Sequence, residues 1–142
     1  MLKGIDPLLS GDLLKVLDDM GHGDELVIAD RNFPAYGTGR PVIRLGEVTI
    51  TRAVQAVLSV FPLDTFIPHP LERMEVAEDP SGTTVRGNEI LAAAIAAEGR
   101  ELELAVVPRF DFYARAAKAY AVIHTLEDEG YNCFILTKGI IA

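Results

Sequence analysis

The sequence predicts a single α/β domain over residues 1–142, with a mainly parallel or mixed central sheet flanked by helices. Three observations lead to this prediction. The length is that of one ordinary domain. A hydrophobic content of 49% beside 24% charged residues is that of a folded globular chain. Segments with helical periodicity alternate along the chain with short apolar runs, which is the pattern of an α/β layer structure.

The first two elements are the clearest. Residues 10–20 carry leucines at helical spacing, Ser10 can accept a backbone N–H at the start of the helix, and Gly21 suits the position after its end. The run 26–29 is apolar without alternation, as in a strand that is buried on both faces.

The rest of the chain continues the alternation. Short apolar runs predict strands around residues 42–44, 48–50, 71–77, 102–107 and 134–136. Capping residues followed by an apolar face predict helices from Thr51 to before Pro62, from Asn88 through Ala97, and over residues 111–124. The segment 66–70 holds two prolines and is expected to be irregular.

Charge and hydropathy exclude some classes of partner. The formal net charge is −8 and no Lys/Arg cluster interrupts the acidic background, so nucleic acid and anionic membrane surfaces are not expected partners. The apolar run from Ile90 to Ala97 is too short to span a membrane. A mean hydropathy of +0.23 is high for so small a chain and indicates that other subunits cover part of its surface.

Cysteine usage and the first residues bear on location and metals. The N-terminus lacks the apolar segment of a secretory signal, and Cys133 is the only cysteine, so we expect a cytoplasmic protein without disulfides. No pair of His, Cys or acidic residues has zinc-ligand spacing, so neither a metal nor another cofactor is expected.

Two residues near the first strand are candidates for chemistry. His22 lies between Gly21 and Gly23, which leave its ring uncrowded; the alternative is a histidine that only favours the negative end of the preceding helix. Asp30 closes the strand 26–29, and ligands of open α/β sheets collect at the carboxyl ends of strands. Its alternative role is to cap a turn.

Later in the chain, Arg109 also follows a predicted strand, where it could hold a hydroxyl or carboxylate group or could pair with Asp111 at the surface. Tyr131 precedes the last strand and offers a phenol that both donates and accepts. Tyr113 and Tyr120 fall in the predicted helix 111–124 and are expected to pack.

Short motifs recur in a particular order and spacing along nearly the whole chain. These are Leu2-Lys3-Gly4-Ile5, Leu17 through Gly21-His22-Gly23-Asp24-Glu25, Asp30 with Phe33-Pro34, Arg109-Phe110 with Phe112-Tyr113 and Lys118-Ala119, and Tyr131 through Ile135-Leu136 to Lys138-Gly139. In these motifs the chain resembles the L-fucose mutarotase and D-ribose pyranase family, and the Arg109-Phe110 pair is closer to the fucose branch.

The resemblance implies a ribose-pyranase-like fold, interconversion of the anomers of a free monosaccharide without a cofactor, and ring-like homo-oligomers, often decamers. It implies that His22 is the proton donor and that Asp30, Arg109 and the segment Tyr131-Asn132-Cys133 bind the sugar. The fucose branch usually has Tyr-Gly-Asn where this chain has Tyr131-Asn132-Cys133, which bears on sugar preference. A D-ribose pyranase, another aldose mutarotase and a non-catalytic sugar-binding or sensing module are the alternatives.

Spacing adds one expectation about the assembly. A strand between His22 and Asp30 separates them by about 16 Å, so the two are not expected to reach one sugar within one subunit. We therefore expect a site that is shared between subunits, with His22 acting as acid and base in turn.

Overall fold

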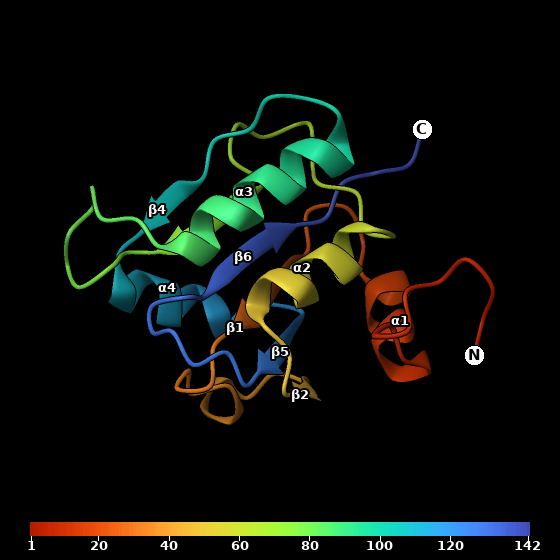
Figure 1. Ribbon diagram of the computed structural model, residues 1–142, viewed down its shortest axis with the longest axis horizontal. Coiled ribbons are helices and arrows are strands. Elements are labelled where there is room, and N and C mark those ends of the chain that lie inside the picture. Colours follow the sequence, from red (N-terminus) through yellow and green to blue (C-terminus); the bar gives the residue numbers. More distant parts are fainter.

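The computed structural model describes residues 1–142 and contains one six-stranded sheet in the order β2-β5-β1-β6-β3-β4 (Figure 1). Strands β1, β2 and β5 are paired in parallel, as are β3 and β4, while β6 lies antiparallel between β1 and β3. The predicted mainly parallel or mixed sheet is therefore confirmed. The strands are β1 (Glu25–Ala29), β2 (Val42–Gly46), β3 (Leu71–Met74), β4 (Ala105–Val107), β5 (Ala121–Thr125) and β6 (Phe134–Thr137).

Helices cover both faces of this sheet. The four α-helices are α1 (Gly11–Asp19), α2 (Ile50–Leu58), α3 (Val85–Glu98) and α4 (Arg109–Ala116), and a short 3₁₀ helix spans Tyr36–Thr38. Residues of α1, α2 and α3 share one apolar core, whereas α4 packs into a second core on the other face. In Figure 1, α2 and α3 lie in front of the sheet and the fainter α4 lies behind it. No helix is both long enough and apolar enough to cross a bilayer.

Strand β1 is the centre of both cores. Leu26 and Ile28 belong to the core beneath α1–α3, and Val27 and Ala29 belong to the core beneath α4; all four are fully buried. Successive side chains of a strand point to opposite faces, so a strand with helices on both sides needs apolar residues at every position. The unbroken apolar run of β1 meets this need, as the sequence predicts.

The helix starts differ from the predictions by a few residues. Helix α1 begins after Ser10, whose Oγ accepts the Leu13 N–H, as predicted. Helix α2 is capped by Thr49 instead of Thr51, so the strand predicted at residues 48–50 is wrong. Gly46 ends β2 in the left-handed region, with a φ of 74°, and the chain turns directly into the helix.

Helix α3 is capped by Thr84 and not by Asn88, one turn earlier than predicted.

The helix predicted over residues 111–124 is wrong in its second half. Helix α4 ends at Ala116, and Ala121–Thr125 forms β5 between β1 and β2. A short apolar run fits the period of a helix and that of a buried strand equally well, and no proline or glycine separates the two elements here. The β-branched residues Val122 and Ile123 pack on opposite faces of the sheet, which favours the strand.

Gly139 allows the end of β6 to pass close to residues 62–64. Its N–H donates to the Pro62 carbonyl at 2.8 Å, and a Cβ at this position would lie 2.7 Å from the Leu63 carbonyl oxygen and 2.8 Å from the Asp64 Cα. Both are backbone atoms, so a side chain at residue 139 would push two chain segments apart.

Gly139→Ala should therefore lower the free energy of unfolding by about 1–3 kcal/mol, the usual range for overpacking. Chemical denaturation of the variant and the wild type measures the difference. Gly11→Ala is the matched control, because a Cβ there meets no atom within 4 Å. Equal stability of Gly139→Ala and the wild type would show that the close approach is not required.

Candidate functional site

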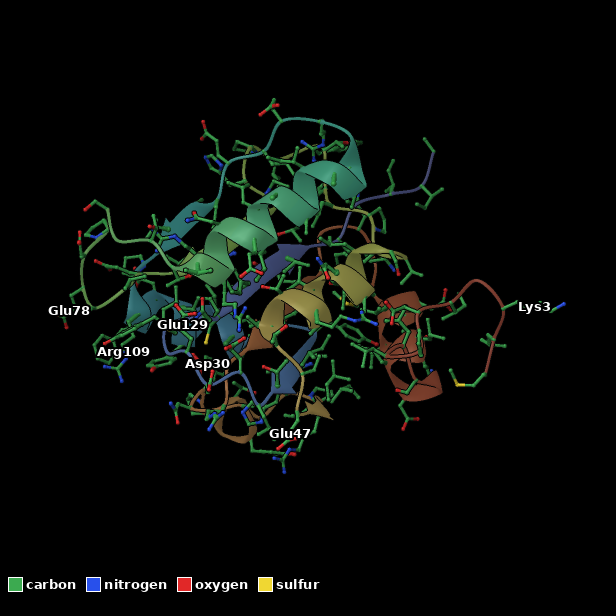
Figure 2. The ribbon with its side chains drawn as sticks, viewed as in Figure 1. Lys3, Asp30, Glu47, Glu78, Arg109 and Glu129 are labelled. Atoms are coloured by element: carbon green, nitrogen blue, oxygen red, sulfur yellow. The ribbon has the colours of Figure 1, made fainter.

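The sheet topology brings four chain segments together at one end of the molecule. The ends of β1, β3 and β4 and the start of β6 all lie there, because β6 alone runs in the opposite direction. These segments enclose a cavity of about 330 Å³. Figure 2 shows Asp30 and Arg109 at this end, far from Lys3. The lining residues are Asp30, Asn32, Phe33, Met74, Arg109, Tyr113, Gly130, Tyr131 and Cys133.

Asp30 follows β1 and is almost completely buried in the cavity wall. Its Oδ1 accepts the Asn32 N–H at 3.0 Å and its Oδ2 accepts the Asn132 N–H at 3.1 Å. Burial raises the pKa of Asp30, while these backbone N–H groups and the Cys133 thiol, which also donates to the carboxylate, act against that rise. Asp30 thus caps a turn, which is one of its two predicted roles, and also lines a cavity.

Arg109 begins α4, at the end of β4. Its Nε donates to the Tyr113 hydroxyl at 2.9 Å, and the guanidinium carbon lies 5.4 Å from the ring centroids of both Phe110 and Tyr113. It forms no ion pair with Asp111, and its two terminal nitrogens make no hydrogen bond within the chain. The exposed guanidinium can therefore donate to a ligand in the cavity.

Tyr113 lines the cavity and orients Arg109, a role that the sequence analysis missed when it assigned this residue to packing. The available indication was its spacing of four residues from Arg109, which places the two side chains on one face of a helix. Tyr120, the other tyrosine of the predicted helix, lies outside any helix and packs against the core beneath α1–α3.

The three residues before β6 have different environments. Tyr131 is 43% exposed, lines the cavity and has a φ of 62°, a left-handed conformation that costs a non-glycine residue about 1–2 kcal/mol. Asn132 is fully buried, and its side chain is not part of the cavity wall. Cys133 is buried in the wall, and burial raises the pKa of its thiol, so the sulfur stays protonated.

His22 lies at the opposite end of β1. Its Nε2 is 3.0 Å from Oδ1 of Asp64, and its side chain is 37% exposed while that of Asp64 is only 4% exposed. The ring also makes an edge contact with Phe66, at 4.8 Å between centroids. His22 lines a separate cavity of about 520 Å³ and does not reach the one at Asp30. Within one chain the two residues are apart, as the spacing predicts.

Main-chain pairing fixes the loop that carries His22. The Gly23 N–H donates to the Lys138 carbonyl, and the Lys138 N–H donates to the Asp24 carbonyl, both at 2.9 Å. These bonds extend the pairing of β1 with β6 beyond the strand ends. The imidazole is therefore carried on a rigid part of the fold.

Asp64 is a candidate functional residue that the sequence analysis did not find. It lies in an irregular segment 42 residues from His22, and no motif marks it. Its Oδ1 also accepts the Phe66 N–H at 3.0 Å. This N–H and the hydrogen bond to His22 lower the pKa of Asp64, so the carboxyl group is ionised near neutral pH. A buried carboxylate that holds a half-exposed imidazole is an arrangement suited to proton transfer.

The structure contains no group of three or more His, Cys, Asp or Glu residues that could hold a metal ion.

Known proteins similar to this chain share its fold and length. A model of the RbsD / FucU transport protein family matches residues 3–141. The L-fucose mutarotase of Haemophilus influenzae (strain PittEE) is 41% identical over 140 residues, which cover 99% of this chain and 97% of that protein.

Two solved structures extend the comparison. The fucose mutarotase of Streptococcus pneumoniae in complex with L-fucose is 36% identical, with a TM-score of 0.88 over 99% of this chain and all of that one. RbsD of Bacillus subtilis, complexed with D-ribose, is 23% identical with a TM-score of 0.77 over the whole of both chains, and this likeness confirms the predicted ribose-pyranase-like fold.

The two site carboxylates should affect the pH dependence of stability in opposite directions. The pKa of Asp30 is raised, so the folded state binds its proton more tightly; stability falls as the pH rises above about 3.9, the value for an unfolded aspartate. The Asn side chain of Asp30→Asn cannot ionise, so this variant should gain stability relative to the wild type as the pH rises above about 3.9.

Asp64 has a lowered pKa, so its contribution to the stability of the folded state is present above about pH 3.9 and is lost as the pH falls further.

The Asp64→Asn variant should accordingly be least stable relative to the wild type near neutral pH and should approach it in acid. Urea unfolding of all three proteins from about pH 2 to about pH 7 measures both trends. Parallel curves for the two variants would contradict the opposite shifts.

Proposed function

We propose that this chain, which belongs to the RbsD / FucU transport protein family, is an L-fucose mutarotase. Such an enzyme is an isomerase that interconverts the α and β anomers of free L-fucose. The relative from Haemophilus influenzae carries that name at 41% identity over nearly the full length of both chains, and the similar protein from Streptococcus pneumoniae binds L-fucose. The structural observation that carries the proposal is the accessible imidazole of His22 held by the buried carboxylate of Asp64.

The chemistry of anomer exchange fits this pair. The ring opens when a proton is delivered to its oxygen and another is removed from the anomeric hydroxyl; C1 then turns its other face and the ring closes. Imidazole can give or take a proton near neutrality, because its ordinary pKa is about 6.5. With Nε2–H donating to Asp64, Nδ1 of His22 is the nitrogen that exchanges a proton with the sugar.

The cavity at Asp30 supplies the groups that hold the sugar. The Asp30 carboxylate accepts hydrogen bonds from hydroxyls, the Arg109 guanidinium donates, and the Tyr131 phenol does both. Cys133 closes the wall beside Asp30, and Asn132 supplies its backbone N–H to the carboxylate. A volume of about 330 Å³ is in the range of small-molecule sites.

We further propose that each site is shared between two subunits of a ring-like homo-oligomer, a decamer by the resemblance to the family. His22 and Asp30 lie at opposite ends of β1, which alone spans about 16 Å. His22 of one subunit would therefore complete the cavity of its neighbour. Large exposed apolar side chains support such a head-to-tail contact, with Phe66 and Ile140 at the His22 end and Phe110 at the Asp30 end.

The reaction as proposed uses side chains alone and needs no cofactor. We place it in the cytoplasm, because the one cysteine of the chain is free and buried, and the reducing cytoplasm keeps thiols in that state.

His22→Ala should lower the rate of catalysed anomer exchange at least about 100-fold, because a positioned acid or base usually contributes that much. Magnetisation transfer in NMR between the two anomers of L-fucose measures the rate, and D-ribose and D-galactose are run beside it, with L-fucose expected to exchange fastest. His124→Ala is the matched control, because His124 lies on β5 and lines neither cavity. Undiminished exchange in His22→Ala would contradict the catalytic role.

A wild type that binds L-fucose without accelerating exchange would be a sugar-binding module instead.

Mixing inactive subunits tests the shared site. His22→Ala keeps the cavity of Asp30, and Asp30→Ala keeps the imidazole, so exchange of subunits between the two variants should regenerate some complete sites and part of the activity. The rate of L-fucose exchange is measured before and after subunit exchange. Each variant subjected to the same treatment alone should stay inactive. If mass spectrometry shows that the oligomers are mixed and they still recover no exchange activity, a site shared between subunits is ruled out.

A further inference from the structure

Asn132 lies directly behind the sugar cavity but presents no side-chain atom to it. The residue is fully buried, between two residues that do line the cavity, Tyr131 and Cys133. Its Nδ2 donates to the carbonyl oxygens of Glu129, at 3.1 Å, and Gly130, at 3.3 Å. Both donors of the amide are thereby used inside the protein, and its oxygen is used as well.

The amide oxygen of Asn132 is bound to helix α3. The Thr84 hydroxyl donates to Oδ1 of Asn132 at 2.8 Å and at the same time accepts the Gly87 N–H at 2.8 Å as the N-cap of the helix. A side chain that caps a helix is fixed by that helix. Asn132 is therefore held from a 14-residue element that packs in the core beneath α1–α3.

Two cavity groups depend on the turn that Asn132 closes. Tyr131 is in the left-handed region, which a tyrosine occupies only where its surroundings impose it. Asp30 receives its Oδ2 hydrogen bond from the backbone N–H of Asn132 itself. A movement of residue 132 would thus displace the phenol of Tyr131 and release one oxygen of the Asp30 carboxylate together.

We propose that Asn132 is a positioning residue, which uses its link to the N-cap of α3 to hold the Tyr131 phenol and the Asp30 carboxylate in place for the sugar. The activity readout of this proposal rests on the proposed function. Asn132 touches neither the anomeric centre nor His22, so its loss should weaken sugar binding much more than it slows proton transfer.

Asn132→Ala should raise the KM for L-fucose about tenfold and change kcat by less than about threefold, since misplaced binding groups lower affinity for substrate and transition state alike. Thr84→Val cuts the same link from the helix side and should raise KM in the same way. Thr84→Ser keeps the hydroxyl, so its KM should stay at the wild-type value. Val57→Ala, in the core on α2, is the control for general loss of stability and should leave KM unchanged.

A readout that needs no sugar keeps this test separate from the proposed function. The chain has four tyrosines, so incorporation of 3-fluorotyrosine gives four ¹⁹F NMR resonances, and Tyr131→Phe identifies that of Tyr131. Asn132→Ala and Thr84→Val should shift this resonance towards the position of a solvent-exposed tyrosine and leave in place those of Tyr36 and Tyr120, which do not line the cavity. Val57→Ala should leave it unchanged.

The proposal is overturned if the Tyr131 resonance stays in place in Asn132→Ala, or if Val57→Ala raises KM as much as Asn132→Ala does. If the wild-type protein exchanges no L-fucose anomers, the proposed function fails, while the fluorine spectra still decide whether Asn132 positions Tyr131.

Discussion

Burial of β1 on both faces is the constraint on which the rest of the structure depends. Leu26, Val27, Ile28 and Ala29 have no exposed surface, so neither face of β1 can carry a polar site over these residues. The candidate groups beside β1 therefore lie beyond its two ends, Asp30 at one and His22 at the other. The structure therefore contains two separate candidate sites, one built around a carboxylate and the other around an imidazole.

The antiparallel strand β6 contributes to both candidate sites. Its start places Tyr131 and Cys133 beside Asp30, and the residues after its end, Lys138 and Gly139, hold the loop of His22 and the segment of Asp64. A parallel strand in the same place would run in the opposite sense, so that its start would lie at the His22 end. The direction of one short strand thus determines which residues meet at either end of the sheet.

The fold could be predicted from the sequence where local patterns agree with the tertiary structure. The leucine stripe of α1 and the unbroken apolar run of β1 are such cases, because helix and strand periods differ clearly there. The helix predicted over residues 111–124 failed in its second half, where Ala121–Thr125 is a strand that pairs with β1 and β2 on either side. Local sequence contains no information about those neighbours.

The same distinction applies to the candidate site. Asp30, Arg109 and Tyr131 could be proposed from sequence, since each lies next to a predicted strand, where ligands of such sheets bind. Asp64 and Thr84 could not, because each is linked to a candidate site residue by one long-range hydrogen bond, to His22 and to Asn132 respectively. Such partners are determined by the packed fold and leave no mark in the spacing of residues along the chain.

The position of β6 also has a consequence for synthesis. It is the last of the six strands to emerge from the ribosome, yet it occupies the middle of the sheet, between β1 and β3. Until it arrives, β1 and β3 lack their shared neighbour and expose unpaired edges, which are prone to aggregation in a nascent chain. Pairing across such long sequence separations is also slow. Neither candidate site can therefore form before β6 has been synthesised, and a chain truncated before β6 would contain neither.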